Sequence, residues 1–239
     1  MAEITSGDVL NIFDNDEPIW NDRWHLYTRK KIEEFIQTNQ NIINESKHII
    51  NAGSSGETYN IDDKKTLHID LVEKRIEDKP HHLVANLEDI PINSQEADLI
   101  VCVGSVINFS DAMLVIKELT KLLKPNGNLI LEFECSNTPE LFWSNKFNAT
   151  AVIHDTFYRH KLLKIWYYSE EWIESILKEY GYTIVNKSKW HFLSAFMLKF
   201  IPWLDFCSLF STFDALARKI PIVKNYSSNI ILLAKKVNA

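Results

Sequence analysis

A stretch of small residues, Asn51-Ala52-Gly53-Ser54-Ser55-Gly56, follows an apolar segment and is the first candidate for ligand binding. Small side chains after a strand let the backbone approach a ligand closely, and the segment that follows can offer free N–H groups to it. An ordinary tight turn between a strand and a helix explains the same residues equally well. The turn therefore marks a candidate site without naming its ligand.

Asp70 strengthens the ligand interpretation because it ends the next apolar segment of the chain. In dinucleotide folds an acidic residue lies roughly 20 residues beyond the glycine turn and holds the ribose hydroxyls. A carboxylate suits that task, since it accepts two charge-assisted hydrogen bonds from a cis-diol. The alternative is that Asp70 only caps a helix beginning near Leu71. Together with the glycine turn, its position favours a ribose site.

The elements that must position these residues follow from hydropathy. Helical spacing or cap residues predict helices over 29–41, 111–123 and 169–181, and Lys124-Pro125-Asn126-Gly127 ends the second of them. Apolar segments predict seven strands, over 47–52, 66–71, 83–86, 97–103, 128–133, 182–187 and 229–235. The alternation predicts an α/β fold with a mostly parallel sheet and helices on both faces. The last two strands flank an apolar insertion, 190–225, and are expected to pair antiparallel at the sheet edge.

Composition limits the class of protein. The chain has 239 residues, 46% of them hydrophobic, which is enough for one sizeable core and predicts a single domain over 1–239. A net charge of −6 without a Lys/Arg block disfavours a nucleic-acid partner. The three cysteines are widely spaced, so neither a disulfide framework nor a metal site is expected. The sequence shows no signal peptide and no apolar run long enough to span a membrane, which predicts a cytoplasmic protein.

Five segments, in order and at suitable spacing, resemble the motifs of the class I S-adenosylmethionine-dependent methyltransferases. They are 51–56, 68–71, 86–91, 98–105 and 122–131. The resemblance is strong over 45–135 and extends in outline to residue 239. It implies a Rossmann-like three-layer sandwich with a seven-stranded sheet, a terminal antiparallel strand and a helical insertion before the last strand.

The resemblance also implies a cofactor, S-adenosyl-L-methionine, and a product, S-adenosyl-L-homocysteine. Asp70 would hold the ribose, Asn86 and the Leu87 N–H would meet the adenine, and Gly104 would lie on the path to the sulfonium. The cofactor-binding residues that it implies are Tyr27, Ala52, Gly53, Ser55, Asp70, Leu71, Asn86, Leu87, Gly104 and Ser105. No metal ligand is implied.

Three positions depart from the family pattern. The family usually has glycine at the position of Ser55, where a side chain leaves less room for the backbone to approach a ligand. It usually has an acid at Asn51 and an aspartate at Asn86. The amide oxygen of Asn86 can still accept a hydrogen bond from the adenine amino group.

Three segments are expected to surround a methyl acceptor: the N-terminal arm and helix within 1–44, residues 136–168, and the insertion 190–225. Residues 136–168 are dense in aromatic side chains, which suits a planar or apolar small molecule, although ordinary core packing explains such rings as well. His154 and Tyr158 are the candidate catalytic residues. His160 is a further candidate base or hydrogen-bond partner, and His25 and His191 belong to the same group, although a histidine without a visible partner is more often structural.

Methyl transfer to an oxygen, nitrogen or carbon atom of a small molecule in a biosynthetic reaction is the leading functional hypothesis. The alternatives are a protein of the same fold that binds the cofactor, or none, and acts through a partner, and a nicotinamide-dependent oxidoreductase. The insertion has four interpretations: a lid over the substrate, a homodimer contact, a peripheral membrane contact through 190–210, and ordinary packing on the sheet edge.

Overall fold

A seven-stranded sheet forms the centre of the molecule. The computed structural model describes residues 6–14, 22–158, 161–217, 219–220, 223 and 225–237. The strand order is β3-β2-β1-β4-β5-β9-β8, and β9 runs antiparallel to both of its neighbours while the pairs from β3 to β5 are parallel. The strands are β1 (Ile49–Ala52), β2 (Thr66–Asp70), β3 (His82–Val84), β4 (Ala97–Cys102), β5 (Leu123–Glu134), β8 (Tyr182–Trp190) and β9 (Asn229–Lys236). This confirms the predicted fold class.

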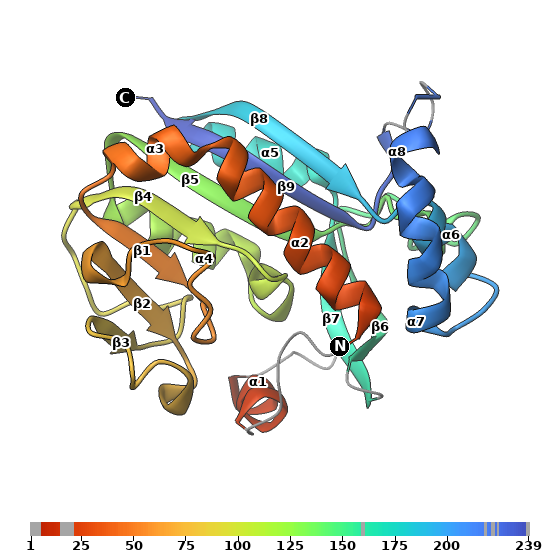
Figure 1. The fold of residues 1–239 in the computed structure, drawn as a ribbon, viewed down its shortest axis with the longest axis horizontal. Helices are drawn as coiled ribbons and strands as arrows, with labels where there is room; N and C mark the ends of the chain where they lie inside the picture. Colours follow the sequence, from red (N-terminus) through yellow and green to blue (C-terminus); the bar gives the residue numbers. More distant parts are fainter. Residues whose placement is uncertain are drawn as a thin grey trace.

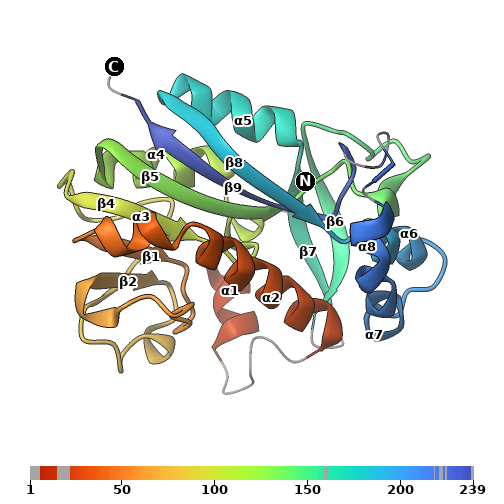
Figure 2. The same cartoon turned by 45° about the horizontal axis from the view of Figure 1, so that its top comes forward.

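Helices cover both faces of the sheet, as expected for strands buried on both sides. Helices α2 (Arg23–Thr38) and α3 (Gln40–Glu45) lie on one face, and α4 (Ala112–Leu122) and α5 (Glu170–Glu179) lie on the other (Figures 1 and 2). The alternation along β5 shows why: Ile130 packs with the residues of α2, whereas Leu129 and Leu131 pack with those of α4 and α5. Because side chains alternate along a strand, Glu132 and Glu134 face the same side as Ile130, toward α2.

Cap residues fix where the helices begin. Asp111 accepts the N–H groups of Met113 and Leu114 at the start of α4, and Ser169 accepts that of Trp172 at the start of α5. Asp22 does the same for α2 through the N–H of His25. The sequence analysis placed the start of this helix at residue 29, and the cap shows that it begins a turn and a half earlier. A further helix, α1 (Ser6–Phe13), forms in a stretch that was expected to lack regular structure.

Residues 136–168 contain an antiparallel hairpin that the sequence analysis missed. Strands β6 (Ala151–Tyr158) and β7 (Lys161–Tyr168) pair along their full length, apart from the main sheet. The many aromatic and β-branched residues of this segment favour strands, but they were assigned only to a substrate wall. A second difference concerns residues 124–127, which end α4 as predicted but are already part of β5, where a register shift opposite Ala97–Leu99 accommodates them.

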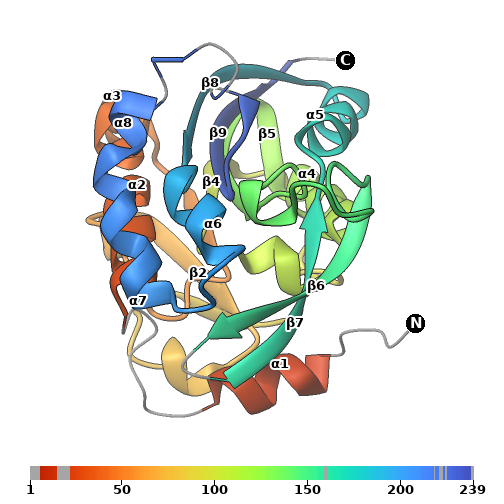
Figure 3. The same cartoon turned by 90° about the vertical axis from the view of Figure 1, so that its right-hand side faces the viewer.

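The insertion before β9 is helical, as predicted, and is attached to the start of α2. It contains α6 (Leu193–Leu198), α7 (Leu204–Cys207), the 3₁₀ segment η5 (Ser208–Phe213) and α8 (Asp214–Ala217). The carboxylate of Asp205 in α7 accepts the N–H of Arg23, 3.0 Å away. Figure 3 shows α6 to α8 and the hairpin on the same side of the molecule. Within the described residues, no helix has the length and apolar character needed to cross a bilayer.

Strand β9 connects the parallel part of the sheet to β8, so truncation of its buried face should destabilise the whole fold. Leu232 is fully buried among the residues of α4 and α5. We expect Leu232→Ala to lower the free energy of unfolding by about 2–5 kcal/mol. Urea unfolding measures this, with Val185→Ala on the exposed side of β8 as the matched control, for which we expect under about 1 kcal/mol. Equal losses in the two variants would contradict the central role of β9.

Candidate functional site

A cavity of about 890 Å³ opens where β1, β2 and β4 end. Its wall joins the turn after β1, the end of β2, the segment after β3 and the end of β4 to Val9 and Phe13 of α1. Helix α1 is held there because the carbonyl of Phe13 accepts from Arg75, and the Phe13 ring lies edge-on to Phe109 at 5.3 Å.

Asp70 presents its carboxylate to this cavity at the end of β2. Its Oδ2 accepts the N–H of Ser55 at 2.7 Å, and its Oδ1 accepts that of Val72 at 2.9 Å. Burial raises the pKa of this carboxyl, and the backbone hydrogen bonds partly oppose that effect. Since each carboxylate oxygen has a further lone pair, Asp70 can accept two more hydrogen bonds, as a ribose diol requires.

The turn after β1 uses backbone conformations that suit glycine. Gly53 has φ +70°, and a Cβ there would lie 2.4 Å from Cγ1 of Val106, so no larger residue fits. Ser55 has φ +45°, which shows that the serine adopts the left-handed conformation available to the family's glycine. Its hydrogen bond to Asp70 holds it there. This departure from the family pattern is therefore accommodated by the backbone.

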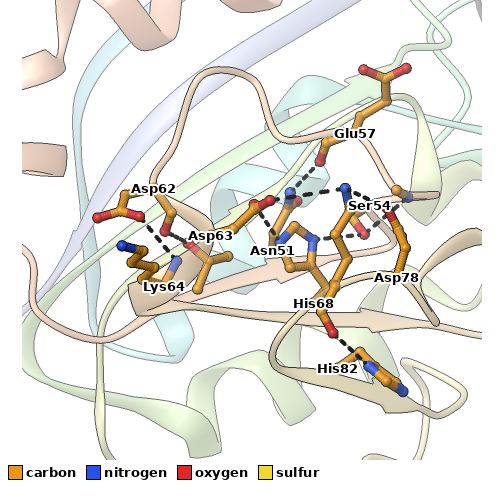
Figure 4. A network of polar contacts seen from close by, with 12 residues as sticks. Asn51, Ser54, Glu57, Asp62, Asp63, Lys64, His68, Asp78 and His82 are labelled. Carbon is orange, nitrogen blue, oxygen red and sulfur yellow. Dashed lines mark hydrogen bonds and ion pairs between the residues drawn. The ribbon is translucent and has the colours of Figure 1, made fainter.

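A network of polar contacts holds the turn after β1 in place (Figure 4). His68 lies between Ser54, 3.3 Å from Nδ1 to Oγ, and Asp63, 3.0 Å from Nε2 to Oδ1. Burial lowers the pKa of His68, although Asp63 acts in the opposite direction. Asn51 donates from Nδ2 to the carbonyl of Glu57 at 2.7 Å, so the second departure from the family pattern also closes the turn.

The structure brings together most of the predicted cofactor residues. Those that line this cavity are Gly53, Ser55, Asp70, Leu71, Asn86, Leu87 and Gly104. Ser105 lines a second, adjoining cavity. Ala52 is fully buried in β1 and Tyr27 donates its hydroxyl to the carbonyl of Ser211 at 3.0 Å, and neither is among the residues that line the first cavity.

Sequence analysis did not single out several residues of this cavity. Phe13 and Val9 come from a helix that was not predicted. Glu57 and Tyr59 follow the turn directly, and Arg29 pairs with Glu57 at 2.9 Å. Glu57 could have been found from the sequence, because it is the acidic residue immediately after the glycine turn.

The second cavity, of about 700 Å³, shares Phe13, Gly104 and Phe109 with the first. Its other walls come from the start of α2, the ends of β5 and β9, the hairpin strands, and α6 and α7. These elements include parts of all three segments expected to surround a methyl acceptor. The two cavities therefore adjoin at the shared residues.

Glu132 in β5 binds the loop after β4, in which Gly104 lines both cavities and Ser105 lines the second. Its Oε2 accepts the N–H groups of Gly104 at 2.9 Å and Ser105 at 2.6 Å, and its Oε1 accepts from Asn229 at 2.8 Å. Gly104 and Ser105 both have positive φ, so these bonds hold a loop in an uncommon conformation. Burial raises the pKa of Glu132 to about 7 against these hydrogen bonds.

Glu134, two residues further along β5, lines the second cavity. Burial raises the pKa of its carboxyl, whereas the hydroxyl of Tyr167, the charge of His25 and the side chain of Ser105 favour the ionised form. A buried carboxylate in a small-molecule cavity was not predicted. The signal was present, because two glutamates alternate with apolar residues at the end of a buried strand.

His25 also lines the second cavity and forms a pair with Asp22. The distance from Nδ1 to Oδ2 is 2.6 Å, and the other oxygen of Asp22 caps the helix through the N–H of His25. Burial disfavours the ionised form of Asp22, but the hydrogen bonds and charge of His25 outweigh it and lower the pKa. Since an ionised carboxylate only accepts, Nδ1 of His25 carries the proton of this hydrogen bond.

Of the two predicted catalytic residues, the structure describes the side chain of His154 but not that of Tyr158. His154 pairs with Glu140 at 3.0 Å, and its ring lies tilted at 4.9 Å from that of Tyr167. Both partners line the second cavity, whereas His154 is not among its lining residues. The side chain of Tyr158 lies outside the described part of the structure, as does His160. His191 is fully buried, stacked on Trp24 at 3.7 Å.

Comparison with known proteins agrees with this architecture. Residues 46–131 match the model of the methyltransferase domain family. No curated protein matches the chain. The sequence resemblance to class I S-adenosylmethionine-dependent methyltransferases is thereby confirmed.

Solved structures share the fold over almost the whole chain. A 1,6-didemethyltoxoflavin-N1-methyltransferase from Burkholderia thailandensis, with bound substrate and S-adenosylhomocysteine, is 11% identical with a TM-score of 0.57 and covers 98% of this chain and 87% of its own. An S-adenosylmethionine-dependent methyltransferase from Clostridium acetobutylicum is 16% identical with a TM-score of 0.55, covering 97% and 99%. The [4+2]-cyclase SpnF is 12% identical with a TM-score of 0.59, covering 100% and 98%.

The buried Glu132 should make stability depend on pH. Its pKa is about 7 in the folded protein and near the ordinary 4.5 in the unfolded chain, so the folded state binds the proton more tightly. The contribution of Glu132 to stability is therefore fully present below about 4.5 and falls as pH rises to about 7, by at most about 1.4 kcal/mol per pH unit. Urea unfolding between pH 4.5 and 8 should show a steeper fall for the wild type than for Glu132→Gln. Parallel pH profiles of the two proteins would contradict this assignment.

Proposed function

We propose that this protein transfers the methyl group of S-adenosyl-L-methionine to a small-molecule acceptor and releases S-adenosyl-L-homocysteine. The observation that carries the proposal is the pair of cavities that meet at Gly104, one with the carboxylate of Asp70 in its wall and the other with polar and aromatic side chains. When bound, the cofactor supplies an electrophilic methyl group on a sulfonium. The protein has to hold the two reactants in line and exclude water.

The first cavity fits this cofactor. Asp70 has the hydrogen-bonding capacity for a ribose diol, and Leu71 and Leu87 offer apolar surface on either side of Asn86 for an adenine. Asn86 keeps its Oδ1 engaged with the N–H of Glu88 at 3.0 Å, which fixes the amide in the wall. The methionine portion would extend along Gly53 toward Gly104. Tyr27 and Ala52 do not line this cavity, so a contact of either residue with the cofactor stays a prediction from the sequence resemblance.

The second cavity fits the acceptor. Trp24, Phe109, Ile165, Leu198 and Leu204 give it apolar walls, which favour an aromatic or otherwise apolar molecule. Phe13 and Phe109 stand between it and the first cavity and limit access of water at the joint. The insertion contributes Leu198 and Leu204, in agreement with a lid.

An acceptor that loses a proton on methylation needs a base. His25 is the first candidate because it lines the second cavity and its Nδ1 is hydrogen-bonded to Asp22. His154 with Glu140 is the second candidate, since His154 itself is not among the lining residues. Tyr158 remains a proposal from the sequence alone.

Binding of the product tests the cofactor assignment. We expect isothermal titration calorimetry to detect S-adenosyl-L-homocysteine with micromolar affinity and to detect no binding of NAD. Asp70→Ala removes the charged acceptor of the ribose hydroxyls, so the affinity should fall roughly 10- to 100-fold. Asp78→Asn, an exposed carboxylate near the other end of the same loop, is the matched control and should bind as the wild type does.

The outcome separates the functional hypotheses. Binding of NAD alone would favour an oxidoreductase. A folded wild type that binds neither compound would overturn the proposal and favour a protein of this fold that acts through a partner.

The base assignment is testable with any acceptor that the protein methylates. We expect His25→Gln to lower kcat by roughly 10²–10⁴-fold while the affinity for S-adenosyl-L-homocysteine stays unchanged. His154→Gln is the comparison, since it removes the other histidine–carboxylate pair, and it should have the smaller effect. The reverse order of effects would assign proton transfer to His154.

A further inference from the structure

We propose that the acceptor is a molecule with a protonatable amine, that it binds in the second cavity with its nitrogen at Glu134 and Asn229, and that His25 takes the proton released there. This inference rests on the proposed function and adds the chemical class of the acceptor. It comes from two carboxylates in the lining of this cavity, Glu134 and Glu140, and from the amide oxygen of Asn229.

Glu134 is the main group. It lies half-buried at the end of β5 on the α2 side of the sheet, and the described lining of this cavity contains no lysine or arginine. The side chains of Tyr167 and Ser105 hydrogen-bond to it, and the imidazole of His25 lines the same cavity. A buried carboxylate is costly unless it is paired, so a ligand that brings a positive charge gains more here than a neutral one.

Asn229 adds a second acceptor. Its Nδ2 donates to Oε1 of Glu132 at 2.8 Å, so Oδ1 is the remaining polar atom of this amide. This Oδ1 is buried and has no hydrogen-bond partner among the described residues, and Asn229 lines the second cavity. A buried polar atom without a partner is uncommon in native proteins and is satisfied when a ligand donates to it.

The same groups disfavour an anionic acceptor. Glu134 and Glu140 both lie in the wall, and a carboxylate or phosphate placed between them would meet like charge at low dielectric. The apolar side chains Trp24 and Ile165 would hold the rest of the molecule. An ammonium group on an apolar body is complementary to both parts of this wall.

The reaction balances with these residues alone and the proposed cofactor. The ammonium gives one proton to the imidazole of His25, whose Nδ1 is hydrogen-bonded to Asp22, and His25 passes that proton to solvent. The free nitrogen lone pair then forms a bond to the methyl carbon as the carbon–sulfur bond breaks. The bonding pair stays on sulfur as a neutral thioether, and the positive charge moves to the methylated nitrogen.

Matched ligand pairs test the selection of charge. In the presence of saturating S-adenosyl-L-homocysteine, calorimetry would compare tyramine with 3-(4-hydroxyphenyl)propionate, and butylamine with pentanoate as a smaller frame. We expect at least one amine to bind about tenfold or more tightly than its carboxylate partner, because it makes charge-assisted hydrogen bonds. Glu134→Gln should abolish that preference without changing the affinity for S-adenosyl-L-homocysteine.

Glu118→Gln is the matched control, since Glu118 is a buried carboxylate of α4 on the opposite face of the sheet, paired with Lys121. It should keep the preference for amines. Amines that do not bind, carboxylates that bind as tightly, or a preference that survives Glu134→Gln would each overturn the inference. If the wild type binds no S-adenosyl-L-homocysteine, the proposed function itself fails. If it binds this product and shows no preference for amines, only the acceptor assignment fails.

Discussion

The hydrogen bonds of the Glu132 carboxylate are the constraint on which the geometry of both cavities depends. One oxygen receives the N–H groups of Gly104 and Ser105 after β4, and the other receives the amide of Asn229 at the start of β9. One side chain thus fixes the ends of three neighbouring strands at the place where the cavities meet. A hydrophobic residue there would leave two buried N–H groups unpaired, which is why a costly charge is kept in the centre of the sheet.

Much of the fold follows from the sequence, because it is encoded by local patterns. Strand β4 is a nearly continuous apolar run and α4 has a cap at Asp111 and an apolar stripe, so both were predicted within one or two residues. The hairpin β6–β7 was missed because its residues are aromatic and polar on both sides, without the strict alternation of a strand against a core. The start of α2 was missed because its cap, Asp22, follows a stretch that lacks helical spacing.

The candidate site also has a part that the sequence predicts and a part that it does not. The residues of the first cavity that were predicted lie at or just after strand ends, as Asp70 does at the end of β2, whereas Val9 and Phe13 come from a helix that was not predicted. The residues of the second cavity come together from distant segments, as His25, Glu134 and Asn229 do, and no spacing along the chain relates them. The [4+2]-cyclase SpnF shares this fold with methyltransferases, so the fold alone does not decide the reaction and the side chains around the ligand must do so.

Phe13 of α1 lines both cavities, so its position matters for both ligands. Because this one ring contributes to both cavities, and α1 is attached to the rest of the protein through Arg75, filling either cavity restricts the position of the same helix. By linkage, a ligand that restricts α1 from one cavity would change the affinity of the other cavity for its ligand, and this effect would be reciprocal.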